Sequence, residues 1–444
     1  MRSQPDTALD AELTRSRRNA VLARLSGAPL ILRSAPQVLR NGDVHFSYRQ
    51  DSSFQYLTGF SEPEAILLAV PEGRASHRTI LFVRKRDPLR EVWDGKRAGV
   101  AGARRRFGAD EAYASDDFWS VLEKESENWA SLAFSLGVDP SFDRSLFELF
   151  AKRLTGRPRR NRGLPSFIDP RPAIHAQRQI KSKEEIALLE EAARISAEGH
   201  KVAMAIARPG MREYEVQAEM EAIFRREGSP RNGYDSIVAG GSNACTLHYV
   251  ANNNRIKKGQ LLLIDAGAEY GQYSADVTRT FPVAGRFSEV QRRVYRVVLR
   301  TQKKCIRAIK PGVTIKRLDL LAKRELTKGL VELGVLRGRL DTLMKRKAFS
   351  RWYMHGFGHW LGMDVHDCGA YENGQGSSVR LKPGMVLTVE PGLYFQANDR
   401  KVRKELRGIG VRIEDDILVT RTGHRNLTEN LEKEIDDIEL LTNG

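Results

Sequence analysis

The chain has 444 residues, a net charge of +17 and 41% hydrophobic residues. That length exceeds what one hydrophobic core usually organises, so two domains are expected. No apolar run approaches the ~18 residues of a membrane span, which excludes a membrane-spanning protein and favours a globular one. The three cysteines, Cys245, Cys305 and Cys368, have no close spacing and favour a reducing, cytoplasmic location.

The positive charge is spread over the chain when it is counted in two blocks. Residues 1–175 hold 28 Lys and Arg against 22 Asp and Glu, and the remaining residues hold 45 against 34. The densest runs, 104–106 and 157–162, are not interleaved with the aromatic side chains that stack on bases. A nucleic acid is therefore not the expected partner, and neither is a membrane.

The first 172 residues predict a small α/β domain. Segments 28–35, 65–70 and 79–86 have the composition of strands, and they alternate with helical segments at 12–25, 116–125 and 142–154. The stretch 156–172 is rich in proline, glycine and arginine, which is the composition of a linker. The predicted domains are therefore residues 1–172 and 173–444.

The second domain repeats one plan. Ser182 and Ser288 each begin a capping box that opens a long helix, and a second helical segment follows each one. Each helix pair leads to a strand that ends in an acid, with Gly259 six residues before Asp265 and Gly384 six residues before Glu390. A returning strand follows in both copies. This order of helix, helix, strand and strand predicts an internal pseudo-twofold repeat.

The acids of the first hairpin are expected to lie close together. If Tyr270 and Gly271 form a two-residue turn, Asp265 is directly opposite Asp276 on one face of the sheet. Like charges in that position repel, so the pair requires a cation. The corresponding acids of the second copy are Glu390 and Glu414. If the two copies face each other, the four carboxylates meet at a common centre.

Three of the nine histidines fall within twelve positions: His355, His359 and His366. Two glycines separate the first two, which argues against a rigid helical pair of metal ligands. A loop that presents one ligand and two imidazoles near the substrate fits better. Four carboxylates and one imidazole suit two divalent ions such as manganese, zinc, cobalt or iron.

Segments 263–283, 355–369, 384–394 and 408–420 resemble the signature segments of the pita-bread metallopeptidases, and specifically those of the aminopeptidase P family. Segment 47–65 of the N-terminal domain is similar as well, and the resemblance covers nearly the whole chain. It implies an α/β N-terminal domain followed by an α+β pita-bread catalytic domain.

Carried over by position, the resemblance implies a complete set of five metal ligands. Asp265 would chelate one metal, and Asp276 and Glu414 would bridge both. His359 and Glu390 would complete the other metal, with Glu390 also acting as the general base. The further implied residues stabilise the tetrahedral intermediate or contact the substrate: His248, His355, His366, Arg412, Tyr234, Tyr394, Asp43 and Trp93.

The implied activity is release of the N-terminal residue from peptides with proline in second position. A metal-bridging hydroxide would attack the Xaa-Pro bond, with manganese as the expected metal and zinc or cobalt as alternatives. The resemblance also implies a homo-oligomer, either a dimer or a tetramer. Two alternatives stay open: an Xaa-Pro dipeptidase (prolidase) on the same scaffold, and a non-catalytic relative that binds nucleic acid or acts as a scaffold.

One segment does not follow the family pattern. Residues 371–380 cannot be aligned without a shift, and Arg380 is their one arginine for contacting a substrate.

Overall fold

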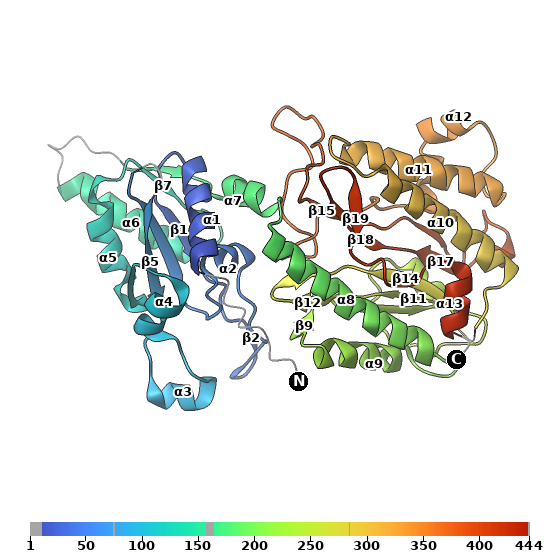
Figure 1. Cartoon of the computed structure of the whole chain (residues 1–444), viewed down its shortest axis with the longest axis horizontal. Coiled ribbons are helices and arrows are strands. Elements are labelled where there is room, and N and C mark those ends of the chain that lie inside the picture. The colour runs from blue at the N-terminus through green and yellow to red at the C-terminus, as the bar shows by residue number, and fades with distance from the viewer. Residues whose placement is uncertain (1–10, 74–75, 157–163, 284, 443–444) are drawn as a thin grey trace. The chain divides into compact units, whose positions relative to one another are not determined.

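The computed structural model describes residues 11–73, 76–156, 164–283 and 285–442. It contains two compact units, one ending at Gln177 and the other beginning at Arg178 (Figure 1). None of the described helices combines the length and the apolar character needed to cross a membrane. Cys245, Cys305 and Cys368 are free thiols.

The N-terminal unit is built on a mixed six-stranded sheet in the order β6-β5-β4-β1-β7-β8. Its core is formed by the apolar side chains of these strands together with the aromatic residues of the covering helices. The predicted α/β class is confirmed for this unit. Its strands are β1 (Leu30–Arg33), β2 (Leu39–Asn41), β3 (Val44–His45), β4 (Ile66–Pro71), β5 (His77–Val83), β6 (Glu111–Ala114), β7 (Ser131–Ala133) and β8 (Ser166–Ile168).

The helices of this unit include the three that the sequence predicts, at 12–25, 116–125 and 142–154. The three predicted helices correspond to α1, α5 and α6. The helices of the unit are α1 (Ala11–Arg24), α2 (Ser52–Thr58), α3 (Pro88–Asp94), α4 (Gly99–Phe107), α5 (Phe118–Glu125) and α6 (Pro140–Gly156).

Part of the predicted linker is regular structure. Of its residues, 157–163 lie outside the described part of the chain. Ser166–Ile168 forms β8 and pairs with β7 in parallel, and α7 (Arg171–Arg178) follows. The linker prediction is therefore wrong for these residues, because a short edge strand depends on its distant partner and not on its own composition.

The C-terminal unit confirms the repeated plan. The two capping boxes are present, with the side chains of Ser182 and Ser288 accepting from the backbone N–H groups of Glu185 and Gln291. The first copy contains α8 (Lys183–Ile206), α9 (Glu213–Arg226), β11 (Leu261–Asp265) and β14 (Thr278–Pro282). The second copy contains α10 (Glu289–Ala308), α11 (Ile315–Glu332), β15 (Val386–Val389) and β18 (Asp415–Val419).

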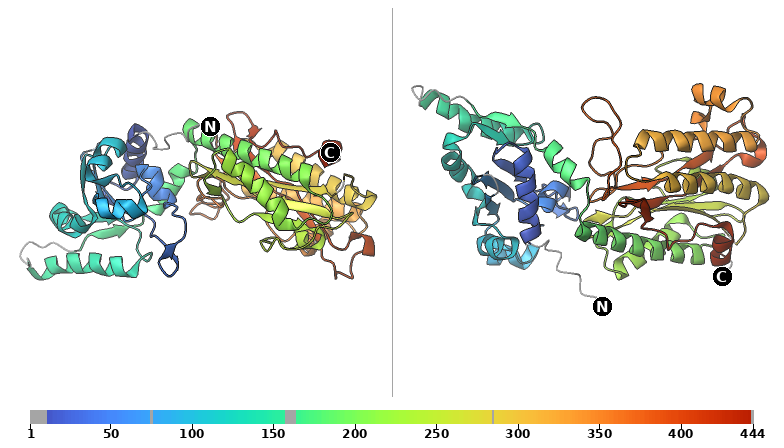
Figure 2. Two further views of the ribbon diagram at one scale, coloured as in Figure 1. Left: turned by 90° about the horizontal axis from the view of Figure 1, so that it is seen from below. Right: turned by 45° about the horizontal axis from the view of Figure 1, so that its top comes forward.

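The strands of both copies lie in the middle of this unit, with α8 and α9 on one side and α10 and α11 on the other (Figure 2). A backbone hydrogen bond from Glu414 N–H to the Thr278 carbonyl joins the copies at their centre. The remaining elements are β9 (Arg231–Asn232), β10 (Ile237–Gly240), β12 (Ala268–Tyr270), β13 (Tyr273–Ser274), α12 (Leu340–Lys345), β16 (Gly392–Phe395), β17 (Ile409–Arg412), β19 (His424–Asn426) and α13 (Ile435–Thr442).

The register of the first hairpin differs from the predicted one by two residues. Asp265 pairs with Thr278, so the predicted direct pairing of Asp265 with Asp276 is wrong. The turn consists of Gly271 and Gln272, whose φ angles are +56° and +65°. A type I′ turn requires positive φ at both central residues, which makes Gly271 the first of them and not the second. Because the shift is even, it leaves both acids on the same face.

Candidate active site

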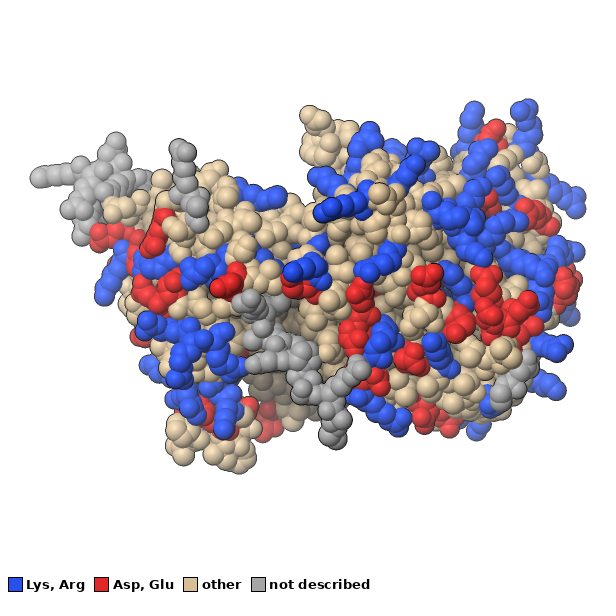
Figure 3. Space-filling model, in the orientation of Figure 1, with Lys and Arg blue, Asp and Glu red and all other residues tan. Residues whose placement is uncertain are grey.

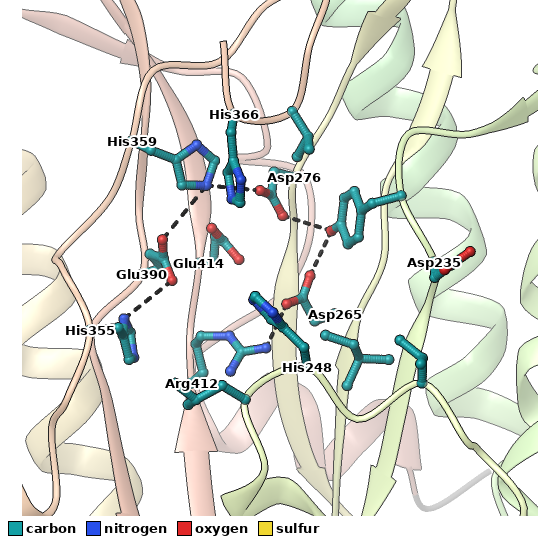
Figure 4. Close-up of a pocket in the computed structure, with 15 residues that line it drawn as sticks. Asp235, His248, Asp265, Asp276, His355, His359, His366, Glu390, Arg412 and Glu414 are labelled. Atoms are coloured by element: carbon teal, nitrogen blue, oxygen red, sulfur yellow. Dashed lines mark hydrogen bonds and ion pairs between the residues drawn. The ribbon is translucent and has the colours of Figure 1, made fainter. Parts of the chain in front are cut away.

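A pocket of about 420 Å³ is lined by residues from both copies of the repeat (Figure 4). Ten of its lining residues are predicted from the sequence: Tyr234, His248, Asp265, Asp276, His355, His359, His366, Glu390, Arg412 and Glu414. The structure therefore brings the five predicted metal ligands to one place. The rest of the lining is largely apolar and was not predicted: Asp235, Ile237, Leu247, Val250 and Val365.

The two acids of the first copy share a tyrosine hydroxyl. The hydroxyl of Tyr234 lies 2.6 Å from Asp265 Oδ1 and 2.6 Å from Asp276 Oδ1. Its single proton can serve one carboxylate at a time. Burial raises the pKa of Asp265, and the Asp276 carboxylate adds to this rise although Arg412 opposes it. The pair thus keeps the repulsion that the sequence predicts, despite the shifted register.

The two acids of the second copy face each other across their hairpin. The strand registers on both sides set Glu390 opposite Glu414. The Thr278 hydroxyl of the first copy donates to Glu414 Oε2 at 2.6 Å. Burial, and then repulsion from Asp276 and Glu390, raises the pKa of Glu414 well above its usual range. Burial likewise raises the pKa of Glu390 to about 7.

His359 directs one ring nitrogen at these carboxylates. Its Nδ1 lies 3.0 Å from the Trp360 carbonyl and donates to it, which leaves Nε2 to face the acids. Nε2 is 3.2 Å from Asp276 Oδ2 and 3.7 Å from Glu390 Oε1. Burial by itself lowers the pKa of His359, but the two carboxylates outweigh burial and raise it to about 9.

The chemistry of this donor set fits divalent metal ions. Ligand atoms of Asp276, His359 and Glu414 all lie within 4.8 Å of one another, and Asp265 and Glu390 line the same pocket. Buried carboxylates at such a density need a cation to offset their repulsion. An oxygen-rich set with one imidazole suits manganese, iron, cobalt or zinc.

The Arg412 guanidinium, from the second copy, donates hydrogen bonds to residues of both copies. Its Nη2 donates to Asp265 Oδ2 at 2.5 Å and its Nε donates to the Thr278 hydroxyl at 3.0 Å. Its Nη1 donates to the Tyr394 hydroxyl at 3.1 Å, and that hydroxyl lies 2.8 Å from His355 Nε2. Burial, and then the charge of Arg412, lowers the pKa of His355 to about 3. This imidazole is therefore neutral and accepts from Tyr394.

Buried ion pairs hold the loop that carries His366. The neighbouring Asp367 accepts from Arg178 at 2.7 Å and from Lys181 at 2.9 Å, and the Asp367 and Lys181 side chains are 1% exposed. His366 packs edge-on against His359, with ring centroids 4.3 Å apart. The histidine loop is thus fixed from behind by side chains that lie outside the pocket.

Three predicted substrate residues and one candidate arginine are not among the residues that line the pocket. Tyr394 is fully buried behind it, in contact with Arg412 and His355. Asp43 and Trp93 belong to the N-terminal unit, where both are exposed, and their role in the substrate pocket stays a prediction. Arg380 donates to the Gly312 carbonyl and is not among the residues that line the pocket.

Sequence reasoning missed two polar residues behind the acids. Thr278 contacts both Glu414 and Arg412, and buried Asp416 accepts from the backbone N–H of Asp276 at 3.1 Å. The available signal was position along a strand. Thr278 lies two residues after Asp276, and Asp416 lies two residues after Glu414, so each shares a strand face with a predicted ligand.

Comparison with known proteins agrees with this geometry. The model of metallopeptidase family M24 matches residues 187–421, and that of the aminopeptidase P N-terminal domain matches residues 14–131. The Xaa-Pro aminopeptidase of Haemophilus influenzae is 42% identical over 436 residues, or 98% of each chain. The chain belongs to the Xaa-Pro aminopeptidases of family M24. The predicted pita-bread catalytic domain is thereby confirmed.

Solved structures of other members of this aminopeptidase family match along the whole chain. Pseudomonas aeruginosa aminopeptidase PepP is 44% identical with a TM-score of 0.94, covering 98% of each chain. Zn-substituted Escherichia coli aminopeptidase P in complex with product is 40% identical with a TM-score of 0.93, again covering 98% of each chain.

Proposed function

We propose that the chain is a dinuclear-metal aminopeptidase that releases the N-terminal residue from peptides with proline in second position. One observation carries this proposal: a chain similar from end to end to Xaa-Pro aminopeptidases also brings five metal-ligating side chains into one pocket. A relative that had lost its activity would be expected to have lost some of these ligands.

The five ligands divide between two ions. Asp265 would be a ligand of one ion, His359 and Glu390 would be ligands of the other, and Asp276 and Glu414 would serve both. The ions, when bound, lower the pKa of a shared water and polarise the scissile carbonyl.

The chain's own side chains carry the proton and position the substrate. Glu390, whose carboxylate lies 3.5 Å and 3.7 Å from the imidazoles of His355 and His359, accepts the proton of the attacking water. It then delivers this proton to the leaving proline nitrogen. His248 and the chain of contacts from Arg412 through Tyr394 to His355 stabilise the oxygen charge that develops at the carbonyl.

Selection of proline follows from what the pocket offers. Proline has no N–H for a peptidase to bind, so its ring is recognised through shape and apolar contact. Apolar side chains suited to that contact line the pocket: Ile237, Leu247, Val250 and Val365. Asp43 and Trp93 stay proposed substrate residues on the family resemblance alone.

The proposal includes manganese as the native metal, although the oxygen-rich donor set accepts several ions and one E. coli relative is described as Zn-substituted. It also places the enzyme in the cytoplasm, in keeping with three free cysteines. A dimer or tetramer is the proposed assembly.

The decisive experiment compares substrate length in one assay. Protein stripped with a chelator is reloaded with manganese, cobalt or zinc and given Xaa-Pro dipeptides, tripeptides and longer peptides. Matched peptides with alanine in second position serve as controls. We expect metal-dependent cleavage of tripeptides and longer Xaa-Pro peptides. Activity confined to dipeptides would identify a prolidase instead.

A further inference from the structure

Most of the net positive charge of the chain lies in one continuous segment. Residues 286–351 hold 20 Lys and Arg against five Asp and Glu, a net charge of +15. The rest of the chain holds 53 against 51. The total of +11 for residues 176–444 conceals this concentration, because residues 176–285 are neutral and residues 352–444 carry a net charge of −4.

The segment forms an outer layer made of α10, α11 and α12, which we call the basic layer. Lys and Arg side chains gather over these helices on the face seen in Figure 3. Twelve of the 20 basic residues form no ion pair with an acid anywhere in the described part of the chain: Arg286, Arg293, Arg296, Arg307, Lys310, Lys316, Arg317, Arg337, Arg339, Lys345, Arg346 and Lys347. Their charge is therefore available to a partner.

The layer lacks the exposed aromatic side chains that favour other anionic partners. Its three aromatic residues, Phe287, Tyr295 and Phe349, are all buried. Stacking on unpaired bases and anchoring in a lipid interface both use exposed aromatic rings. A protein interface likewise concentrates aromatic and apolar anchors at its centre, and here the exposed large apolar residues are Leu320 and Val331.

The arginine content of the layer and the length of α10 suit a phosphate backbone. Twelve of the 20 basic residues are arginines, whose planar guanidinium groups bind phosphate oxygens in pairs. The 20 residues of α10 span ~30 Å, close to the ~34 Å of one duplex turn. Arg293, Arg296 and Arg307 lie three and eleven residues apart along this helix, which is about one turn and three turns.

A hollow of about 370 Å³ lies at the C-terminal end of α10. Its lining includes Lys303, Arg307, Arg425 and Lys433, with Glu429 as its one acid among the lining residues. His424 also lines it and directs Nδ1 to the Ile309 carbonyl at 3.0 Å. Of the basic residues of this hollow, Arg307 forms no ion pair in the described part of the chain, whereas the other three pair with Glu434, Glu190 and Asp415.

We propose that the basic layer binds the phosphodiester backbone of duplex nucleic acid without sequence preference, on a surface separate from the peptidase pocket. The proposed peptidase activity neither requires this binding nor is tested by it.

The experiment measures fluorescence anisotropy of labelled 20-bp RNA and DNA duplexes as a function of salt. Arg296, Arg307 and Arg317 are exposed and lie outside the peptidase pocket. The variant R296E/R307E/R317E is compared with R104E/R105E/R106E, which makes the same charge change at exposed arginines of α4. Turnover of an Xaa-Pro peptide reports whether each variant is folded.

We expect the wild-type protein to bind a duplex at 50 mM salt with a steep salt dependence. The basic-layer variant should bind at least about tenfold more weakly and with a flatter salt slope, because each lost phosphate contact lowers the slope by ~0.9. The α4 variant should retain wild-type binding, and both variants should retain turnover.

Several results would overturn the proposal. These are absence of duplex binding at 50 mM salt, an equal loss in both variants, or tighter binding of a single strand of the same length. Tighter binding of poly-glutamate would instead indicate an acidic protein partner. Tighter binding of phosphatidylglycerol-containing vesicles would indicate a membrane surface.

Discussion

The two copies of the repeat build their halves of the pocket from equivalent positions that carry different side chains. In the first copy Asp265 pairs with Thr278, and in the second copy the equivalent residue, Glu390, is opposite Glu414. Thr278 and Glu414 therefore occupy equivalent positions. Two residues earlier, Asp276 and Arg412 are equivalent in the same way. The direct opposition of two acids that the sequence predicts for the first copy occurs in the second, where Glu390 faces Glu414. Each copy therefore supplies what the other lacks at the centre.

The two copies also differ in how tightly their acids are held by neighbouring side chains. Asp265 is fixed by short contacts to Tyr234 and Arg412, at 2.6 Å and 2.5 Å. Glu390 instead contacts two imidazoles at 3.5 Å and 3.7 Å. A duplicated scaffold can thus draw its proposed metal ligands from both copies and place its proton carrier on only one of them.

The largest expected effect comes from removing that proton carrier. Glu390→Ala should lower kcat for an Xaa-Pro tripeptide by a factor of about 10³ or more, because it removes both a metal ligand and the general base. Steady-state kinetics with manganese-loaded protein measures this. Glu372→Ala, at an exposed acid of the unaligned loop, is the control. Substantial activity in the Glu390 variant would mean that the second copy does not carry the reacting group.

A second test concerns the histidine loop, which only the second copy contains. Asp367→Asn should reduce the free energy of unfolding by ~3–5 kcal/mol, because it leaves Arg178 and Lys181 buried without their acid. Asp364→Asn provides the comparison, since Asp364 also pairs with Arg178 but its side chain is 41% exposed. Urea unfolding of both variants checks the difference, and equal stabilities would show that the buried pairs do not fix the loop.

The anchoring role of the first copy can be tested with one hydroxyl. Tyr234→Phe should weaken metal binding or activity by ~10–100-fold, because the Asp265 and Asp276 carboxylates lose their shared donor. Metal titration by calorimetry together with kcat/KM gives the measurement. Tyr249→Phe removes a hydroxyl that contacts Glu213 in the same copy and should leave metal affinity unchanged. If both variants behave alike, the Tyr234 hydroxyl does not organise the acids.

The smallest expected effect is a pH dependence of stability that belongs to the first copy. Burial lowers the pKa of His200 to about 4, and its Nε2 contacts the Ala266 carbonyl beside Asp265. The unfolded chain binds a proton near pH 6.5 and the folded one near pH 4. Stability is therefore complete above pH 6.5 and should fall by ~2 kcal/mol by pH 5.

Comparison with a variant isolates this histidine from other titrating groups. His200→Gln should unfold in urea with a smaller loss between pH 7 and pH 5 than the wild type. The position of α10 equally distant from its capping serine is Ile306, so the second copy has no such group there. An unchanged pH dependence in the variant would remove His200 as its source.

The repeat and the clustering of its acids and histidines could be predicted because they depend on local spacing, whereas the set of five ligands rests on the family resemblance and stays a prediction. The capping boxes at Ser182 and Ser288 and the matching six-residue intervals could be read directly. The register of the first hairpin could not be predicted, because it depends on a positive φ angle at Gln272. Glutamine has no preference for that conformation. Strand β8 depends on a partner far along the chain, so no local pattern contained it. The spacing of Thr278 from Asp276 indicated its strand face but not its contacts with Glu414 and Arg412.

The uneven charge of the two helical layers affects how the protein is oriented when it binds to a charged surface. Residues 182–228, which contain α8 and α9, hold seven Lys and Arg against ten Asp and Glu, whereas the basic layer carries +15. The catalytic unit is therefore an electric dipole as well as a cation. A negatively charged support should capture it in one preferred orientation, with α8 and α9 facing the solution.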